Sequence, residues 1–173
     1  MEKNNLLALY CIGVIVLAFI DQISKLAVLK FVRPVETIPL IENVFHLTYC
    51  ENRGAAFGIL QNRFGLFFCI TAVVLVAVTV YMIKKRPQNL CVNLSVTLLA
   101  GGALGNFIDR IFRGFVVDFF DFRLIHFAIF NVADCFVVCG AVLLAWYLIF
   151  VEGDTEAEHK KDGAGRGESR SLR

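Results

Sequence analysis

The sequence predicts an all-α membrane protein with four transmembrane helices and a small extracytoplasmic cap that contains short β-strands. The first observation is composition: 58% of the 173 residues are hydrophobic and 18% are charged, whereas soluble proteins average about 25% charged residues. The second is the distribution of charge, since 11 of the 17 basic and 15 acidic residues lie in residues 152–173. The remaining chain has too few charged side chains to cover a domain in water, so lipid is its expected solvent.

The third observation is a set of four long apolar runs, the first of which covers residues 6–29. A helix of roughly 24 residues crosses about 30 Å of hydrocarbon with some tilt. A cleavable signal peptide is the alternative interpretation. It fits poorly, because no small-x-small cleavage site follows Ile20 and the apolar pattern resumes after Asp21 and Lys25.

Three further apolar runs predict spans at about residues 65–83, 90–109 and 129–151. Each exceeds the length of about 11–12 residues that is average for helices of soluble proteins. Residues 1–151 are therefore expected to form one four-helix transmembrane domain. Residues 152–173 mix acidic and basic side chains with Gly and Ser, and this composition predicts a disordered cytoplasmic tail.

The short connection after the second span indicates the orientation in the membrane. Three of its six residues, 84–89, are basic, and the positive-inside rule places such a loop in the cytoplasm. Both termini are then cytoplasmic, and segments 31–63 and 110–128 are extracytoplasmic. Counted over the whole chain, nine basic residues lie inside and eight outside, but long tails carry little weight in this rule.

Charge and cysteine usage exclude several other classes of protein. A net charge of +2 does not indicate a nucleic-acid partner. The six cysteines form no Cys-x-x-Cys pair and no zinc-like grouping with the three histidines. We therefore expect no metal and no cofactor, and we expect most of the cysteines to pack among the helices as small apolar side chains.

Several polar residues gather at the outer ends of the predicted spans. A charged side chain at the bilayer centre costs about 2.5–3.5 kcal/mol, so such a residue indicates a functional site. Asp21 and Lys25 are four residues apart and share a helix face, where they can form an ion pair; an interfacial pair that reaches out to the headgroups is the alternative. Residues 52–58 read as a turn or re-entrant segment, and the glycines at 101–106 allow another helix or a substrate to approach.

Two aspartates have a special relation to the third and fourth spans. Asp118 follows the third span and Asp134 begins the fourth, both on the outer side, so the intervening segment can bring them face to face. Two carboxylates in one apolar site share a proton, and such a pair can activate water for attack on an amide carbon. Taken singly, each fits an exposed or helix-capping Asp, and carboxylate pairs also serve proton or cation transport.

Five motifs, in this order, resemble the lipoprotein signal peptidases (signal peptidase II). They are DQISK at 21–25, NRGAAF at 52–57, GGALGNFIDR at 101–110, VVDF at 116–119 and FNVAD at 130–134. The resemblance covers about residues 6–150 and leaves only the tail without a counterpart. It implies an aspartic endopeptidase of the bacterial cytoplasmic membrane that needs no cofactor.

The resemblance also implies the substrate and the site residues. The substrates would be prolipoproteins that carry diacylglycerol on a cysteine, and the enzyme would cut just before that cysteine. Membrane lipids would be the other partners, and we expect a monomer. Asp118 and Asp134 match the catalytic pair; the matching positions that orient or shape the site are Asn106, Arg110, Asn131, Asp21, Lys25, Asn52 and Gly54. Asp109 matches a structural position. Segment 31–63, with a β-leaning stretch at 46–49, is expected to form a cap over the site.

Two other hypotheses use the same residues. A small transporter or proton-coupled channel would also keep carboxylates in the membrane, but these acids are confined to one side and do not form a path across it. A purely structural subunit leaves the cost of so many interfacial polar groups unexplained. A peptidase differs from both because it requires each aspartate for cleavage.

Overall fold

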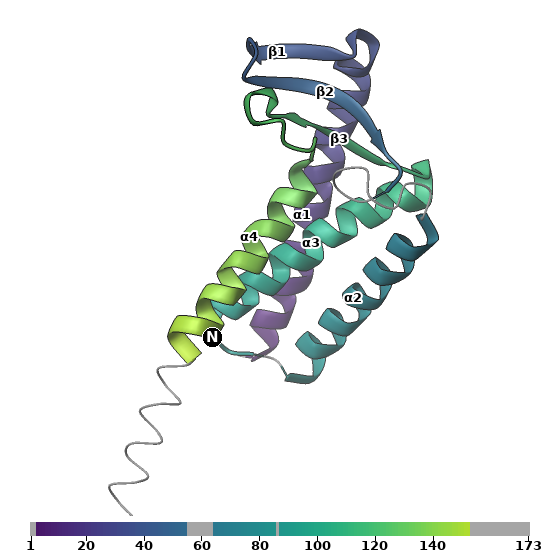
Figure 1. Cartoon of the computed structure of the whole chain (residues 1–173). Coiled ribbons are helices and arrows are strands. Elements are labelled where there is room, and N and C mark those ends of the chain that lie inside the picture. Colours follow the sequence, from purple (N-terminus) through teal and green to yellow (C-terminus); the bar gives the residue numbers. More distant parts are fainter. Residues whose placement is uncertain (1–2, 55–63, 86, 153–173) are drawn as a thin grey trace, which may run out of the picture.

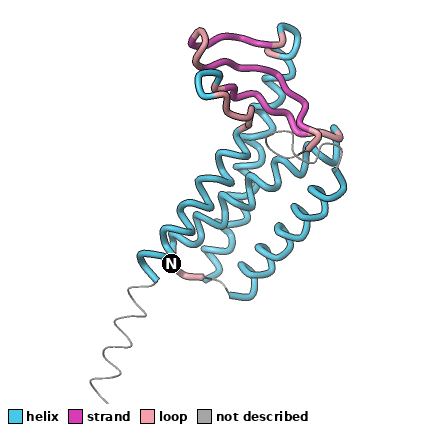
Figure 2. The backbone as a smooth tube through the Cα atoms, in the orientation of Figure 1, coloured by secondary structure: helices cyan, strands magenta, loops and turns pink. Residues whose placement is uncertain are grey.

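The structure, a computed structural model, describes residues 3–54, 64–85 and 87–152 (Figure 1). Four long helices form a bundle, and a small sheet lies at one end of it (Figure 2). The predicted tail, apart from its first residue, and residues 55–57 of the NRGAAF motif lie outside the described residues. This arrangement of four apolar helices and a short-stranded cap confirms the predicted fold class.

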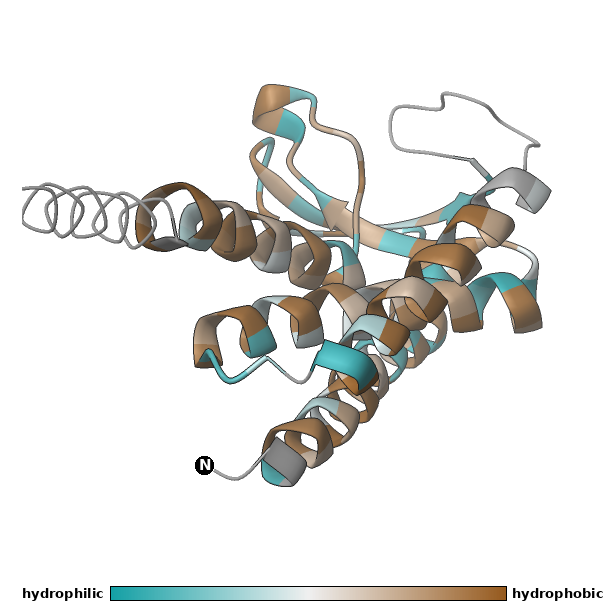
Figure 3. Cartoon of the chain, turned by 90° about the horizontal axis from the view of Figure 1, so that it is seen from below, coloured by the Kyte–Doolittle hydropathy of each residue, from teal (hydrophilic) through white to brown (hydrophobic). Residues whose placement is uncertain are grey.

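The four helices are α1 (Lys3–Phe31), α2 (Phe64–Lys85), α3 (Leu90–Arg113) and α4 (Val132–Trp146), the last continued by the π-helical turn η4 (Tyr147–Glu152). Each lies in a segment that is long and apolar enough to cross a membrane. Figure 3 shows the ribbons of these helices largely in brown, the colour of hydrophobic residues. Exposed side chains such as Ile15, Val76 and Val142 form a lipid-compatible surface.

Helix α3 is the centre of the bundle. Half of the most apolar 18-residue stretch of α3 is buried, whereas only 6% of the corresponding stretch of α2 is buried. Helix α2 packs mainly on α3. The core cluster Tyr10, Met82, Val92, Val96 and Ala100 joins α1, α2 and α3. Because α3 contacts each of the other three helices, the polar side chains of its last turns are held from several sides.

Helices α3 and α4 end and begin at capping residues rather than at the limits of hydropathy. Helix α3 continues past the expected limit at 109 to Arg113, because Asp109 and Arg113 form an ion pair inside the protein. Gly114, with φ of 76°, terminates the helix. Helix α4 begins at Val132, after the N-cap Asn131. Hydropathy follows the solvent around a helix, whereas caps decide its ends.

The cap is an antiparallel sheet in the order β1-β2-β3, formed by β1 (Thr37–Ile41), β2 (Phe45–Asn52) and β3 (Val116–Asp121). Strand β2 pairs Cys50 with Asp118 and Asn52 with Val116. Short 3-10 turns, η1 (Arg33–Val35) and η3 (Arg123–Ile125), flank the sheet. The register therefore brings the end of β2 beside Asp118.

The sheet packs against the C-terminal end of helix α1. The 29 residues of α1 extend about 43 Å at 1.5 Å per residue, more than the hydrocarbon thickness of about 30 Å. Val28 and Val32, at this end of α1 and just past it, pack with Val117 and Phe119 of β3. This second core cluster fixes β3, and with it Asp118, to the first helix.

Candidate active site

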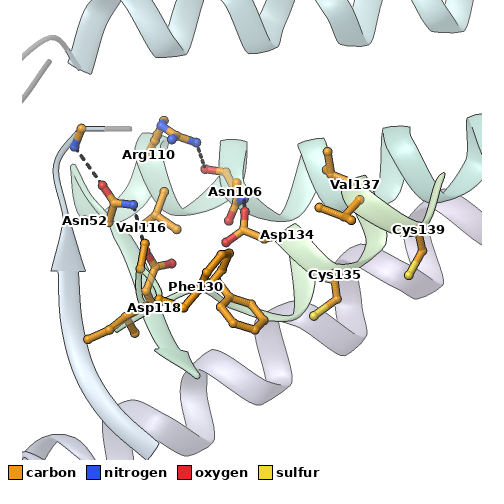
Figure 4. Close-up of a pocket in the computed structure, with 15 residues that line it drawn as sticks. Asn52, Asn106, Arg110, Val116, Asp118, Phe130, Asp134, Cys135, Val137 and Cys139 are labelled. Carbon is orange, nitrogen blue, oxygen red and sulfur yellow. Dashed lines mark hydrogen bonds between the residues drawn. The ribbon is translucent and has the colours of Figure 1, made fainter. Parts of the chain in front are cut away.

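Asp118 and Asp134 line one cavity of about 540 Å³ between the sheet, α3 and α4 (Figure 4). Asp118 lies in β3 and is 1% exposed, and Asp134 lies in the first turn of α4. Asn52, Gly54, Asn106 and Arg110 line the same cavity, as do Val116, Phe127, Ala128, Ile129, Phe130, Cys135, Val137, Val138 and Cys139. The cavity thus joins a polar end that holds both carboxylates to an apolar end.

Asn131 connects the two aspartates. Its side-chain oxygen accepts the backbone N–H of Asp134 at 3.0 Å, and its own backbone N–H donates to Asp134 Oδ2 at 3.1 Å, which together form a capping box. Its side-chain Nδ2 donates to Asp118 Oδ1 at 2.5 Å. One fully buried residue therefore caps α4 and sets the position of both carboxylates.

Asn52 holds the other oxygen of Asp118. Its Nδ2 donates to Asp118 Oδ2 at 2.8 Å, and its side-chain oxygen accepts the backbone N–H of Gly54 at 3.0 Å. The antiparallel register brings Asn52 to this point, since it pairs with Val116, two residues before Asp118. Gly54 is buried at the wall of the cavity. Both oxygens of Asp118 thus accept an amide N–H.

Asn106 links Asp134 to a buried charge network. Its Nδ2 donates to Asp134 Oδ1 at 2.7 Å, and its Oδ1 accepts from Asn131 at 3.2 Å and from Lys25 Nζ at 2.9 Å. Arg110, one turn later on α3, donates to the backbone oxygen of Asn106 at 3.2 Å and presents its positive charge to the cavity. These contacts supply donors and positive charge around the carboxylate pair.

Asp21, Lys25 and Asp109 lie behind the cavity and do not line it. Lys25 Nζ is 2.8 Å from Asp21 Oδ2 and 3.0 Å from Asp109 Oδ2, and all three side chains are fully buried. The expected pairing of Asp21 with Lys25 is therefore present, and the pair is inside the protein rather than at a headgroup-facing surface. Asp21 also accepts the backbone N–H of Ala133 at 3.0 Å, and Asp109 that of Val117 at 3.0 Å.

Asp21, Lys25 and Asp109 therefore hold the backbone next to both catalytic candidates, because Ala133 precedes Asp134 and Val117 precedes Asp118. Gln22 and Arg113 complete this buried charge network by hydrogen bonding to Asp109. Sequence reasoning missed these two residues. The available signal was a glutamine beside Asp21 and an arginine one turn after Asp109 on the predicted helix face.

Two glycines of α3 permit these close approaches. A Cβ at Gly105 would lie 2.5 Å from Asp21 Oδ2, and one at Gly102 would collide with the backbone oxygen of Ala133. Both positions therefore require the absence of a side chain. The glycine run at 101–105 thus brings α1 and the start of α4 against α3, next to Asn106.

Burial of Asp118 and the negative charge of nearby Asp134 raise the pKa of the Asp118 carboxyl to about 7. The hydrogen bonds from Asn52 and Asn131 and the charge of Lys25 act in the opposite direction and lower this pKa. Near neutral pH, the Asp118 carboxyl is therefore protonated to a much greater extent than a solvent-exposed aspartate. A pair with one proton offers a base and a hydrogen-bond donor in the same cavity.

The polar side chains around Asp118 and Asp134 carry carboxylate, amide and guanidinium groups. Among residues 3–54, 64–85 and 87–152, no group of three or more His, Cys, Asp or Glu side chains is arranged to hold a metal ion. Carboxyl groups that line one cavity can transfer protons to and from a bound water molecule or carbonyl group.

Comparison with known proteins confirms the resemblance suggested by the five motifs. The family model for signal peptidase (SPase) II matches residues 13–150. The lipoprotein signal peptidase of Clostridioides difficile (strain 630) is 49% identical over 144 residues, which are 83% of this chain and 97% of the relative. The lipoprotein signal peptidase of Halothermothrix orenii (strain H 168) is 50% identical over 137 residues, 79% of this chain and 92% of the relative.

A solved structure supports the same relationship. A bacterial membrane enzyme determined by the in meso method at 1.9 Å resolution matches with a TM-score of 0.73 and 33% sequence identity, over 83% of this chain and 94% of that one. The family match at residues 13–150 spans the residues that line the cavity, and the structural match agrees with it in fold. The chain belongs to the signal peptidase II family.

Proposed function

We propose that this protein is an aspartic endopeptidase of the bacterial cytoplasmic membrane that removes the signal peptide from diacylglyceryl-modified prolipoproteins. The cut falls just before the lipidated cysteine. The observation that carries the proposal is the position of Asp118 and Asp134 in one cavity, joined by the side chain of Asn131. Membership of the signal peptidase II family supports the substrate class.

The carboxylate pair performs the cleavage with water as the nucleophile. Asp118, with the raised pKa, carries the shared proton and hydrogen-bonds the scissile carbonyl oxygen. Ionised Asp134 takes a proton from the water as its oxygen attacks the carbonyl carbon, and Asp118 transfers its proton to the developing oxyanion. Asp134 then donates its proton to the leaving amide nitrogen while Asp118 recovers a proton from the tetrahedral diol. The C–N bond breaks, and the pair returns to its starting state.

The neighbouring groups prepare this reaction. Asn52 and Asn131 orient Asp118, and Asn106 orients Asp134, so neither carboxyl must reorganise when charge develops. Arg110 adds a positive charge at the cavity wall. The apolar end of the cavity, which includes Ile129 and Val138, suits the lipid-modified part of a substrate that diffuses within the bilayer.

The proposal places the sheet and the cavity on the extracytoplasmic side. The lysines that end α2 lie at the end of the bundle opposite the sheet (Figure 1), and the positive-inside rule assigns that end to the cytoplasm. The carboxylate pair then lies near the outer headgroups, where a translocated precursor presents its cleavage site. The same orientation makes both termini cytoplasmic.

The experiment compares Asp118→Asn and Asp134→Asn with Asp121→Asn in purified, folded protein. Asp121 belongs to the same strand as Asp118 but bonds Thr48 and Arg123 of the cap. Asp118→Asn and Asp134→Asn are each expected to abolish release of the signal peptide, and Asp121→Asn is expected to retain it. Normal cleavage by either dyad variant would refute the mechanism. Equal cleavage of precursors with and without diacylglycerol would refute the substrate class.

A further inference from the structure

Two thiols line the wall of the cavity one helical turn apart. Cys135 directly follows Asp134, and Cys139 lies four residues later on α4; both are free cysteines. Residues at this spacing share one face of a helix. Figure 4 shows the two sulfur atoms on the same side of α4. Neither thiol has a part in the proposed cleavage mechanism.

The helix holds this pair in the dithiol form. The Cβ atoms of residues i and i+4 of a helix are about 5–6 Å apart, whereas a disulfide needs Cβ atoms about 3.5–4.5 Å apart. A direct S–S bond would therefore distort the first turns of α4, which carry Asp134. A bridge with one additional atom between the sulfurs spans the gap without that distortion. No other two cysteines of the chain have this spacing.

The cavity has room for a group attached to such a bridging atom. Its volume of about 540 Å³ exceeds the roughly 150 Å³ of an engineered cavity that binds benzene. Phe127, Phe130 and Val138 provide an apolar surface beside the thiols. Cys139 is exposed on the helix surface and Cys135 is half-buried, so a reagent dissolved in the lipid phase can reach the pair.

We propose that Cys135 and Cys139 form a dithiol site, within the cavity of the carboxylate pair, that captures trivalent organoarsenic oxides, R–As=O. Two As–S bonds form and the bond between arsenic and oxygen is lost. The oxygen leaves as water with the two thiol protons, and arsenic remains trivalent. The aryl group then occupies the apolar end of the cavity, next to Asp134. The capture site itself is independent of the proposed function, whereas the inhibition that follows from it rests on that function.

The test treats the full-length protein with phenylarsine oxide in the presence of excess monothiol, which removes arsenic held by a single cysteine. Intact mass spectrometry is expected to find one phenylarsenic group per wild-type chain. Cys135→Ser and Cys139→Ser are each expected to lose this adduct, and the matched variants Cys69→Ser and Cys91→Ser, on α2 and α3, are expected to keep it. Persistence of the adduct in Cys135→Ser or Cys139→Ser would overturn the assignment.

Cleavage measured on the same samples tests the place of the site in the cavity. Each variant is compared with its own untreated sample. Treatment is expected to stop wild-type cleavage, a small dithiol is expected to restore it, and Cys139→Ser is expected to be resistant. An adduct that leaves wild-type cleavage intact would refute the location in the cavity. If the protein proves to have no peptidase activity, the mass measurement still decides whether the dithiol site exists.

Discussion

The ammonium group of Lys25 donates a hydrogen bond to the side-chain oxygen of Asn106, 2.9 Å away. An ammonium group has no acceptor, so this contact determines which end of the Asn106 amide faces Lys25. The amide nitrogen is left to donate to Asp134 Oδ1 at 2.7 Å. A lysine that does not line the cavity thereby positions a group that does.

Replacement of Lys25 by Met is expected to destabilise the protein strongly and to reduce cleavage. It leaves the buried carboxylate of Asp21 without its counter-charge, and Asp109 keeps only Arg113 as a cationic partner. Loss of one partner from a buried ion pair costs about 3–5 kcal/mol. Lys30→Met is the matched control, since Lys30 is exposed on the same helix. Thermal unfolding in detergent measures the stability of the two variants. An unchanged unfolding temperature for Lys25→Met would contradict the role of the network.

Asn131→Ala separates the capping role from the catalytic role when it is compared with Asn89→Ala. Each asparagine is the N-cap of a helix, α4 and α3 respectively, and loss of such a cap costs about 1 kcal/mol. The two variants are therefore expected to lose similar stability through the cap. Only Asn131→Ala also removes the donor to Asp118 and is expected to lose most cleavage activity. Comparable activity in the two variants would show that Asn131 acts through the helix alone.

The raised pKa of Asp118 predicts the pH dependence of cleavage. As the pH rises through about 7, the carboxyl pair loses its shared proton, and kcat/KM, which reports the free enzyme, is expected to fall. The hydrogen bond from Asn52 favours the ionised form, so Asn52→Leu raises the pKa of Asp118 further. The alkaline limb of the profile is then expected to move to higher pH.

Thr48→Val is the control for this measurement. Thr48 lies in the same strand as Asn52 but donates to Asp121 instead of Asp118. Its profile is expected to keep the wild-type alkaline limb. A shift to lower pH in Asn52→Leu, or an equal shift in Thr48→Val, would show that the limb does not report Asp118.

Gly102→Ala is expected to reduce cleavage by displacing the start of α4. The added methyl group would collide with the backbone oxygen of Ala133, and a rigid backbone atom cannot move aside without moving Asp134. Gly65→Ala is the matched control in α2, because a methyl group there meets nothing within 4 Å. Cleavage assays of both variants, at equal amounts of folded protein, test this. Full activity of Gly102→Ala would show that the contact tolerates a shift.

The helices and the two aspartates could be predicted from the sequence because their signals are local. Hydropathy over some 20 residues reports the solvent around a helix, and the polar motifs lie at the ends of such runs. The β-leaning stretch at 46–49 indicated a strand in the same way. Pairing of β2 with β3 was outside the reach of this reasoning, since it joins segments separated by two helices.

The supporting contacts were equally inaccessible, because they depend on tertiary distance. Lys25 and Asn106 are 81 residues apart in the chain, and nothing in the local pattern of either residue indicates the other. Asp109 illustrates the same limit: the resemblance suggested only a structural position, whereas the structure makes it the second counter-ion of Lys25. Local patterns identify the residues that carry chemistry, and the packing of α3 decides how they are connected.

The hydrogen bond from Ala133 of α4 to Asp21 of α1 has a consequence for biosynthesis. The ribosome produces α1 first and α4 last, so the first segment to enter the membrane must wait for the last before its aspartate finds this partner. Asp134 arrives with that same final segment. Until that segment is inserted, the nascent chain contains only one of the two aspartates of the proposed catalytic pair. Under the proposed mechanism, cleavage therefore requires that the insertion of α4 is complete.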